Sequence, residues 1–384
     1  MLTAHPELPA PSDAARAHSV ALAQTIREEI DRSGGWIDFA RYMTLALYAP
    51  GLGYYAAGSH KLGEAGDFVT APELSPLFST TLARQMAEVL QSTGGDILEL
   101  GAGTGRMAAD ILVALDELGD LPQRYRILEV SSDLRARQRT YLTALPARLA
   151  ARVEWLDALP DDLRGVVVAN EVLDALPVHL IAWRQNGVFE RGVSHGEAGF
   201  VYADRPLESA ALRARVERLD LAAPYVSEVS MAAPALVHDL AQRLRHGVLL
   251  LIDYGFGSSE YYHLQRRTGT LMCHYRHRAH DDPFFLPGLQ DITAHVDFTA
   301  VAEAGVAGGA ALLGYTNQAG FLINRGITDL LARRAQADRY YVQVANVQKL
   351  LSPAEMGELF KVLALGRGID RLAGFSRGDL SRLL

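Results

Sequence analysis

The sequence contains a single cysteine, Cys273, among its 384 residues. One thiol cannot form an internal disulfide, an iron–sulfur cluster or a multi-cysteine zinc site, and such scarcity is typical of a reducing cytosol. Apolar runs are short, and none reaches the roughly 18 residues that a membrane-spanning helix requires. The first twenty residues lack the basic start and apolar stretch of a secretory signal. We therefore expect a cytoplasmic protein without membrane insertion.

Basic residues are fewer than acidic ones: the sequence has 37 Lys and Arg residues and 45 Asp and Glu residues, and its net charge is −8. A broad electrostatic surface for nucleic acid is not expected from this balance. Apolar residues make up 49% of the chain and charged residues 21%, which is ordinary globular composition and excludes a mostly disordered chain. The length predicts one large elaborated domain or two unequal ones.

Short apolar strands alternate with amphipathic helices from residue 96 onward, a pattern typical of a parallel α/β sheet buried on both faces. The predicted strands are 96–100, 126–130, 153–156, 166–169 and 248–252. We predict a helical and loop cap over residues 1–80 and a main domain over residues 81–384. That domain carries an insertion, 175–246, between the fourth and fifth strands, with a hairpin and helices, and a polar loop, 255–295.

A glycine-rich turn follows the first predicted strand and precedes a helix. It reads Glu99-Leu100-Gly101-Ala102-Gly103-Thr104-Gly105, which is G-x-G-x-G spacing. Glycines allow a tight turn and bring backbone N–H groups against a ligand. The dinucleotide motif G-x-G-x-x-G would need Gly or Ala where Arg106 stands. Glu99, before the turn, would repel a pyrophosphate but suits an amino-bearing ligand.

Two further acidic residues follow neighbouring strands. Glu129 ends the second strand at the usual distance for binding ribose hydroxyls, and Asp157 follows the third strand and can reach an adenine amino group. Together with the glycine turn, these acids predict binding of S-adenosylmethionine rather than NAD. An alternative reading is that the glycines only permit close helix–sheet packing and that both glutamates are solvated strand ends.

The fourth strand runs into Asn170-Glu171-Val172-Leu173-Asp174, where ligands bind in open α/β sheets. A permanently charged arginine substrate would need carboxylates that aim one nitrogen at the methyl group. Glu171 and Asp174 are candidates for this clamp, and Asn170 for orienting the cofactor or acceptor. Asp253, at the end of the fifth strand, points to the same rim. A helix N-cap at Asn170 or Asp174 is the simpler alternative.

Other polar residues are weaker candidates. Asp67 and Glu73 could approach from the amino-terminal cap, although each also fits a local turn or helix start. His295 is either a rim residue or part of an ordinary helix start. The histidines beside Cys273 do not follow a known metal-ligand spacing and stand among arginines, so we expect no metal site.

Several sequence blocks together resemble the MidA-like proteins, a family that includes the mitochondrial respiratory complex I assembly methyltransferase. They occur in the family's order from about residue 36 to residue 366, nearly the whole chain. The blocks are MTLALYAPGLGYY, GDFVTAPELSPLF, ILELGAGTGR, YRILEVSSDLRARQ, VVVANEVLDALPV, LLIDYG, the PG and DITAHVDF of LPGLQDITAHVDF, NQAGFL and MGELFKVLALG.

The resemblance implies a seven-stranded class I methyltransferase fold that uses S-adenosylmethionine. For the mitochondrial branch it implies symmetric methylation of an arginine in a complex I subunit, hence a protein partner. The family's motifs fall on Glu99, the three glycines and Glu129, on Asn170, Glu171, Asp174 and Pro177, and on Gly66, Asp67, Phe68, Thr70 and Glu73. The alternatives are a noncatalytic assembly factor that retains the fold and an NAD-linked oxidoreductase.

Overall fold

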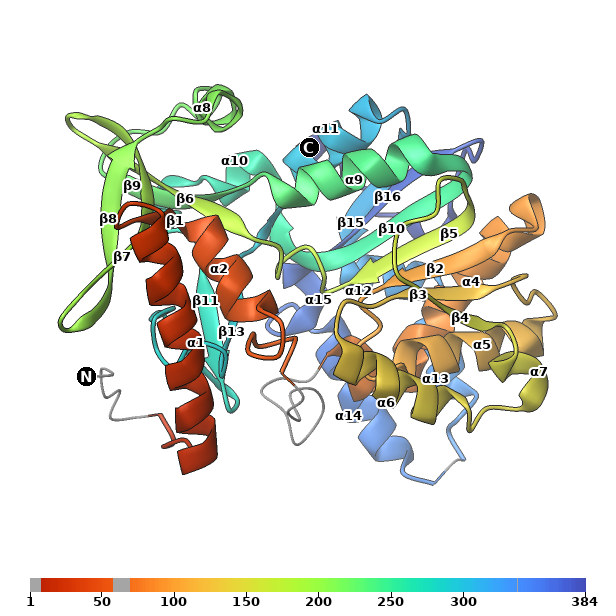
Figure 1. Ribbon diagram of the computed structural model, residues 1–384. Helices are drawn as coiled ribbons and strands as arrows, with labels where there is room; N and C mark the ends of the chain where they lie inside the picture. Colours follow the sequence, from red (N-terminus) through yellow and green to blue (C-terminus); the bar gives the residue numbers. More distant parts are fainter. Residues whose placement is uncertain (1–7, 58–69, 337) are drawn as a thin grey trace. The chain divides into compact units, whose positions relative to one another are not determined.

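The computed structural model describes residues 8–57, 70–336 and 338–384 (Figure 1). These residues form two compact units, each assembled from segments far apart in the sequence. The first unit combines the described residues before 58 with Asp174–Ala233 and Ser259–His295. The second combines the chain from residue 70 to Leu173 with Pro234–Ser258 and Val296–Leu384.

The second unit is built around a mixed sheet in which seven strands lie in the order β15-β16-β10-β5-β2-β3-β4. An eighth strand, β14, pairs with β10, so the sheet has one strand more than the seven expected. Strands β4, β3, β2, β5 and β10 are parallel, whereas β16 is antiparallel to both β10 and β15. The strands are β2 (Asp96–Leu100), β3 (Tyr125–Leu128), β4 (Val153–Leu156), β5 (Leu163–Asn170), β10 (Leu244–Phe256), β14 (Val296–Asp297), β15 (Ala311–Asn317) and β16 (Phe360–Arg367).

Helices pack on both faces of this sheet, with α4 and α5 on one side and α9 and α11 on the other (Figure 1). Burial on two faces explains why β5 and β10 each contain a continuous apolar run, at residues 166–169 and 248–252. The core includes Ile97, Val166 and Leu250 from strands and Met86 and Leu112 from helices. The helices are α3 (Ala71–Leu74), α4 (Pro76–Thr93), α5 (Arg106–Leu118), α6 (Ser132–Leu142), α7 (Ala147–Ala150), α9 (Ala232–Arg243), α11 (Phe298–Ala307), α12 (Gln318–Asn324), α13 (Ile327–Ala332), α14 (Tyr340–Leu351) and α15 (Met356–Leu359).

The first unit contains two antiparallel sheets. The larger has the order β1-β7-β6-β9 with β8 on β7, and the smaller has the order β12-β11-β13. The smaller sheet lies within residues 255–295, which we expected to be a loop. The elements are α1 (Asp13–Arg32), β1 (Ile37–Asp38), α2 (Phe39–Tyr48), β6 (Val178–Arg184), β7 (Gly187–Gly196), β8 (Gly199–Pro206), α8 (Ala210–Val216), β9 (Tyr225–Ser230), α10 (Ser258–Tyr261), β11 (Met272–Tyr275), β12 (Arg278–His280) and β13 (Asp291–Thr293).

The compact units differ from the boundaries expected from the sequence. The amino-terminal segment does not stand alone as a cap, because β1 pairs with β7 of the insertion through Ile37 and Val193. A side chain at Gly192 would place its Cβ only 2.2 Å from the carbonyl oxygen of Ile37, so this pairing depends on glycine. Helix α4, which begins before residue 81, belongs to the second unit.

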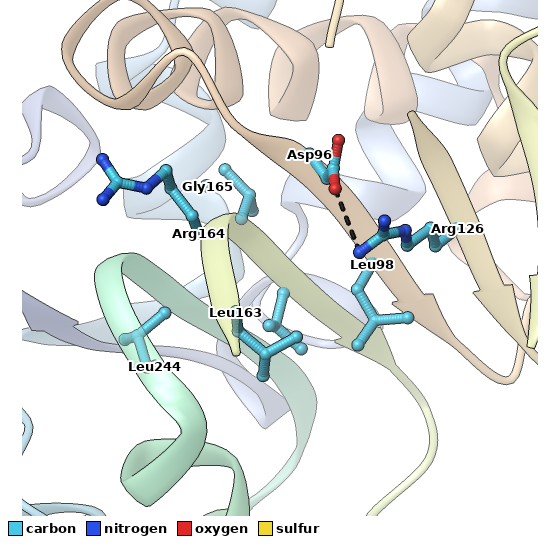
Figure 2. Close-up of a pocket in the computed structure, with 9 residues that line it drawn as sticks. Asp96, Leu98, Arg126, Leu163, Arg164, Gly165 and Leu244 are labelled. Carbon is cyan, nitrogen blue, oxygen red and sulfur yellow. Dashed lines mark ion pairs between the residues drawn. The ribbon is translucent and has the colours of Figure 1, made fainter. Parts of the chain in front are cut away.

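A small pocket lies at the amino ends of the parallel strands of the second unit (Figure 2). Its lining includes Leu163 and Leu244, the first residues of β5 and β10, and Asp96, which pairs with Arg126 at 3.1 Å. Ligands of open α/β sheets bind at the opposite, carboxyl edge. This pocket is therefore separate from the predicted cofactor site. Among the described helices, none has the length and apolarity needed to cross a membrane.

Candidate functional site

The glycine turn joins β2 to α5 at the carboxyl edge of the sheet. Gly101, Gly103 and Gly105 have φ angles of 61°, 55° and 86°, in the left-handed region that favours glycine. A Cβ at Gly101 would lie 3.1 Å from Cγ2 of Val172, so the turn also passes close to the loop after β5. The left-handed φ angles and the missing Cβ atoms of the three glycines would allow a ligand to approach the backbone of this turn closely. Ala102, between the first two glycines, is buried.

Glu99, near the end of β2, is not a solvated strand end, since only 1% of it is exposed. The Tyr125 hydroxyl donates a hydrogen bond of 2.7 Å to its Oε2. Burial raises the pKa of the Glu99 carboxyl to about 7, and the neighbouring Glu129 charge adds to the shift while the Tyr125 bond opposes it. A buried carboxylate of this kind is stabilised by a cationic or amino-bearing ligand.

Glu129 directly follows β3 and is 6% exposed. Its Oε1 accepts the backbone N–H of Ser131 at 2.9 Å, and its Oε2 accepts an amide hydrogen of Gln138 at 3.0 Å. Burial raises the pKa of the Glu129 carboxyl, and these two hydrogen bonds oppose the shift. Glu99 and Glu129 are thus both enclosed, which contradicts the alternative reading that they are solvated strand ends.

Asp157 lies beyond β4, and its side chain is 90% exposed. It forms an ion pair with Arg135 of α6. Arg135 also donates to the carbonyl oxygens of Glu129 and Leu156, at 3.2 and 2.8 Å, and so fixes the ends of β3 and β4 relative to each other. The adenine contact assigned to Asp157 stays a prediction.

The loop after β5 has a strained backbone. Glu171 has φ of 54°, an uncommon angle for a residue with a side chain. Its N–H donates to the carbonyl oxygen of Ile252 at 2.9 Å, and its Oε1 accepts an amide hydrogen of Asn170 at 3.0 Å. Oδ1 of Asn170 is buried and has no hydrogen-bond partner among the described residues. Strain and an unsatisfied polar atom at a ligand-binding edge indicate a functional site.

Asp253 of β10 holds this loop in place. Its Oδ2 accepts the backbone N–H groups of Val172 at 3.2 Å and Leu173 at 2.9 Å, and its Oδ1 accepts the N–H of Tyr254. Only 1% of Asp253 is exposed. We expected this acid to face the substrate. Three of its hydrogen bonds come from backbone N–H groups, two of them in the loop that follows Glu171, and its substrate role stays a prediction.

Glu73 and Thr70 belong to the second unit. The Glu73 carboxylate accepts a hydrogen bond from the Thr104 hydroxyl, which connects α3 to the glycine turn. Thr70 precedes α3 as its N-cap residue, and its side chain makes no capping hydrogen bond. Asp67 was also predicted to approach the site, and it lies outside the described residues.

Asp174 and His295 belong to the first unit. Asp174 is 5% exposed, and its carbonyl oxygen accepts the N–H of Ala294 at 3.0 Å. The N–H of His295 donates to the hydroxyl of Thr270 at 3.1 Å. The bond from Ala294 to Asp174 joins two segments of the first unit, whereas the bond from His295 to Thr270 lies within one segment. The substrate roles of both side chains stay predictions.

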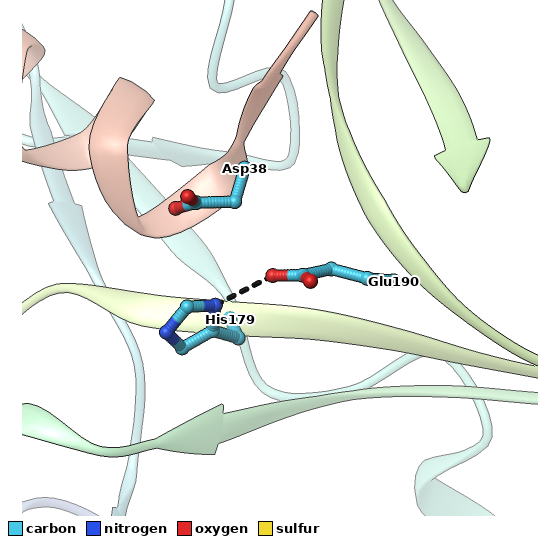
Figure 3. Close-up of side chains that lie close together, drawn as sticks. All are labelled: Asp38, His179 and Glu190. Atoms are coloured by element: carbon cyan, nitrogen blue, oxygen red, sulfur yellow. Dashed lines mark hydrogen bonds and ion pairs between the residues drawn. The ribbon is translucent and has the colours of Figure 1, made fainter. Parts of the chain in front are cut away.

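Three side chains of the first unit, Asp38, His179 and Glu190, offer ligand atoms within 4.8 Å of one another (Figure 3). Nδ1 of His179 lies 2.7 Å from Oε1 of Glu190. Asp38 accepts the backbone N–H of Arg41 at 2.7 Å as the N-cap of α2, whose positive end already stabilises a carboxylate. A cross-strand pair and a helix cap account for this group, so we assign no metal to it.

Gln138 and Tyr125 contact the predicted cofactor acids but were not predicted from the sequence. Gln138 occupies the buried face of α6 together with Leu142. A polar residue at a core-facing helical position is a signal that was available in the sequence. Tyr125 gave no such signal, because an aromatic residue in a predicted strand is ordinary core.

Known proteins resemble this chain over most of its length. Residues 81–316 match the sequence model of a family described as "Putative S-adenosyl-L-methionine-dependent methyltransferase". The mitochondrial protein arginine methyltransferase NDUFAF7 of Rattus norvegicus is 32% identical, with 87% of this chain and 82% of the relative covered. The Homo sapiens protein of the same name is 30% identical, with 87% and 81% covered.

A solved structure gives a closer match. A protein of Burkholderia thailandensis, crystallised with bound S-adenosylhomocysteine, is 55% identical to this chain and superposes with a TM-score of 0.95. The match covers 98% of this chain and 100% of the other.

Proposed function

The chain belongs to the MidA-like family of S-adenosylmethionine-dependent methyltransferases, and from this premise we propose that it methylates an arginine side chain of a protein partner. S-adenosylmethionine is the cofactor, and the enzyme class is methyltransferase. The names of the mitochondrial relatives support arginine as the acceptor. Symmetric methylation and a respiratory complex I subunit as the partner, which the family resemblance implies, are part of the proposal.

The second unit has a suitable place for the cofactor. The glycine turn would let the cofactor approach its backbone closely. Glu99 suits the amino group of the methionine part of the cofactor, and Glu129 suits the ribose hydroxyls. When bound, S-adenosylmethionine supplies a methyl group already activated by its sulfonium. The contribution of the protein is therefore mainly positioning and exclusion of water.

The observation that carries the proposal is the strained loop at Asn170 and Glu171. A left-handed residue with a side chain costs roughly 1–2 kcal/mol, and here it persists because Ile252 and Asp253 hold the backbone. The result is a fixed carboxylate beside a buried amide oxygen that has no hydrogen-bond partner in the part of the chain that the structure describes. This pair suits a guanidinium, which offers several N–H donors and a permanent positive charge.

The carboxylate of Glu171 would bind the guanidinium and localise its charge away from the acceptor nitrogen. As that nitrogen forms its bond to the methyl carbon, the bond from carbon to sulfur breaks and S-adenosylhomocysteine is left. The acceptor nitrogen must lose a proton, and a carboxylate in contact with the group can take it and pass it to solvent. Asp174, three residues later, is the second acid assigned to the substrate.

The test compares Glu171→Gln with the wild type, using radiolabelled methyl donor and a cell extract as the source of protein substrate. We expect methyl transfer to fall by at least a hundredfold while affinity for S-adenosylhomocysteine stays within a few-fold, because the variant keeps the side-chain shape and loses the charge. Glu117→Gln, on the exposed surface of α5, is the matched control. Equal loss of binding and transfer would place Glu171 in the cofactor site instead.

The same assay separates an enzyme from a noncatalytic assembly factor. Wild-type protein should label an extract protein, and Gly103→Asp, which blocks the glycine turn, should not. Mass spectrometry of the labelled protein should identify dimethylarginine, with fragment ions that distinguish the symmetric isomer. Labelling of lysine alone, or no labelling by the wild type, would contradict the proposal.

A further inference from the structure

Gln138, in the middle of α6, is fully buried. Burying a primary amide is unfavourable unless its donors and acceptor are all bonded. Helix α6 is otherwise strongly polar, and its other buried residue is Leu142. An apolar residue at position 138 would serve packing equally well, so the glutamine calls for a specific explanation.

The Gln138 amide bonds to three segments of the cofactor edge. Nε2 donates to the carbonyl oxygen of Gly103 at 2.9 Å and to Oε2 of Glu129 at 3.0 Å. Oε1 accepts the indole N–H of Trp155 in β4 at 3.0 Å. One side chain therefore connects the glycine turn after β2, the acid after β3, and the neighbouring strand β4.

These bonds fix the orientation of the Glu129 carboxylate. The N–H of Ser131 donates to Oε1, the amide of Gln138 donates to Oε2, and the backbone N–H of Val130 also donates to this carboxylate. A carboxylate can accept about four hydrogen bonds, so capacity for a ligand hydroxyl remains. Two adjacent hydroxyl groups, as in a ribose, match two oxygens held in this way. The bond to Gly103 fixes the same carboxylate relative to the turn.

We propose that Gln138 is a positioning residue that aims the Glu129 carboxylate at the 2′- and 3′-hydroxyls of the cofactor ribose and holds the glycine turn at the matching distance. The proposal rests on the assignment of Glu129 as the ribose acid. Its distinctive consequence is that substituting Gln138 weakens recognition of the ribose diol in particular, whereas a merely structural residue would weaken all ligands alike.

The experiment measures binding of S-adenosylhomocysteine and of its 2′,3′-dideoxy analogue by calorimetry. We expect the wild type to prefer the natural ligand by about ten- to a hundredfold, since hydrogen bonds to a charged group are at stake. Gln138→Met, which keeps length and removes the amide, should bind S-adenosylhomocysteine about tenfold more weakly. Its affinity for the dideoxy analogue should stay within threefold of the wild type, so that the preference collapses.

Gln85→Met is the matched control. Gln85 is equally buried in α4, but its amide bonds to Glu88 and to the backbone at Gly374. This variant should lose stability and keep the full preference for the natural ligand.

Each outcome decides a different question. A wild type that binds both ligands equally would refute the assignment of Glu129. A wild-type preference that survives unchanged in Gln138→Met would overturn the positioning role of Gln138 alone. Should Gln138→Met fail to fold, Trp155→Phe removes the indole N–H that anchors the amide and keeps an aromatic ring at this position. It should lower the preference about threefold, and an unchanged preference would again overturn the inference.

Discussion

The hydroxyl of Tyr125 donates to the Glu99 carboxylate at 2.7 Å, across the adjacent parallel strands β2 and β3. This contact encloses an acid at the end of a strand, which the sequence predicts as a cofactor residue and which the alternative interpretation expects to be solvated. The charged form of Glu99 is costly to bury. Both the stability of the protein and its affinity for the cofactor should therefore depend on pH.

The Glu99→Gln variant should be more stable than the wild type at alkaline pH. The pKa of Glu99 in the folded protein is raised to about 7 from an ordinary 4.5, so its favourable contribution is complete below pH 4.5 and lost as pH rises through 7. The variant has no titratable group at this position and keeps its stability. Its free energy of unfolding should exceed that of the wild type by about 3 kcal/mol at pH 8. Urea unfolding at pH 5, 6, 7 and 8 measures this difference.

Glu117→Gln, which removes an exposed glutamate from α5, is the control and should show no comparable trend. An advantage of Glu99→Gln that is the same at pH 5 and pH 8 would contradict the raised pKa.

Cofactor binding should release a proton from Glu99 near pH 7. An amino-bearing ligand favours the ionised carboxylate and therefore lowers its pKa below the raised value of the isolated protein. Titrating S-adenosylhomocysteine in buffers with different ionisation enthalpies should give different heats for the wild type, and this difference should shrink in Glu99→Gln. Identical heats in all buffers would show that the ligand does not contact Glu99.

Replacing Asp253 by Asn should uncouple the loop after β5 from the sheet. The amide can accept fewer of the three N–H groups that Asp253 binds, so we expect a stability loss of about 2–3 kcal/mol. Glu171 should then leave its left-handed conformation, and methyl transfer should fall at least tenfold with little change in S-adenosylhomocysteine affinity. Normal transfer in a folded, destabilised variant would show that the loop geometry is not needed.

Gly101→Ala should destabilise the protein and weaken cofactor binding. The left-handed φ costs an alanine about 1–2 kcal/mol, and its Cβ would press on Val172 at 3.1 Å. Adding Val172→Ala should recover the packing part of the loss. Gly119→Ala, after α5, has φ of 80° and nothing within 4 Å of its Cβ, so it reports the backbone cost alone. If Gly101→Ala and Gly119→Ala bind S-adenosylhomocysteine equally well, the glycine turn tolerates the contact between the new Cβ and Val172.

Removing the Thr104 hydroxyl should loosen the glycine turn. Thr104→Val keeps the shape but loses the bonds to Glu73 and to the N–H of Arg106. We expect S-adenosylhomocysteine affinity to fall about three- to tenfold, consistent with the loss of about 1 kcal/mol. Thr80→Val, which loses a hydroxyl bonded to Pro76 within α4, is the control and should bind normally. Matching affinities for the two variants would show that the hydrogen bond between Thr104 and Glu73 does not support cofactor binding.

Local features of the chain were predictable from the sequence alone. The apolar run of β5, the glycine turn after β2 and the hairpin of β6 and β7 at Gln185-Asn186-Gly187 each depend on a few consecutive residues. Apolar periodicity and the backbone freedom of glycine act within that distance. The sequence therefore determined the α/β class and the candidate cofactor acids.

Which residues those acids contact was decided only by the tertiary structure. Glu99 is buried because β3 brings Tyr125 beside it, Asp253 turns to the backbone of residues 172 and 173, and Gln138 reaches Gly103 and Glu129 from another helix. The division into units likewise depends on β1 pairing with β7, more than 150 residues later in the chain. Burial, pKa and hydrogen bonding follow from neighbours in space, and local residue patterns do not encode which distant segments become neighbours.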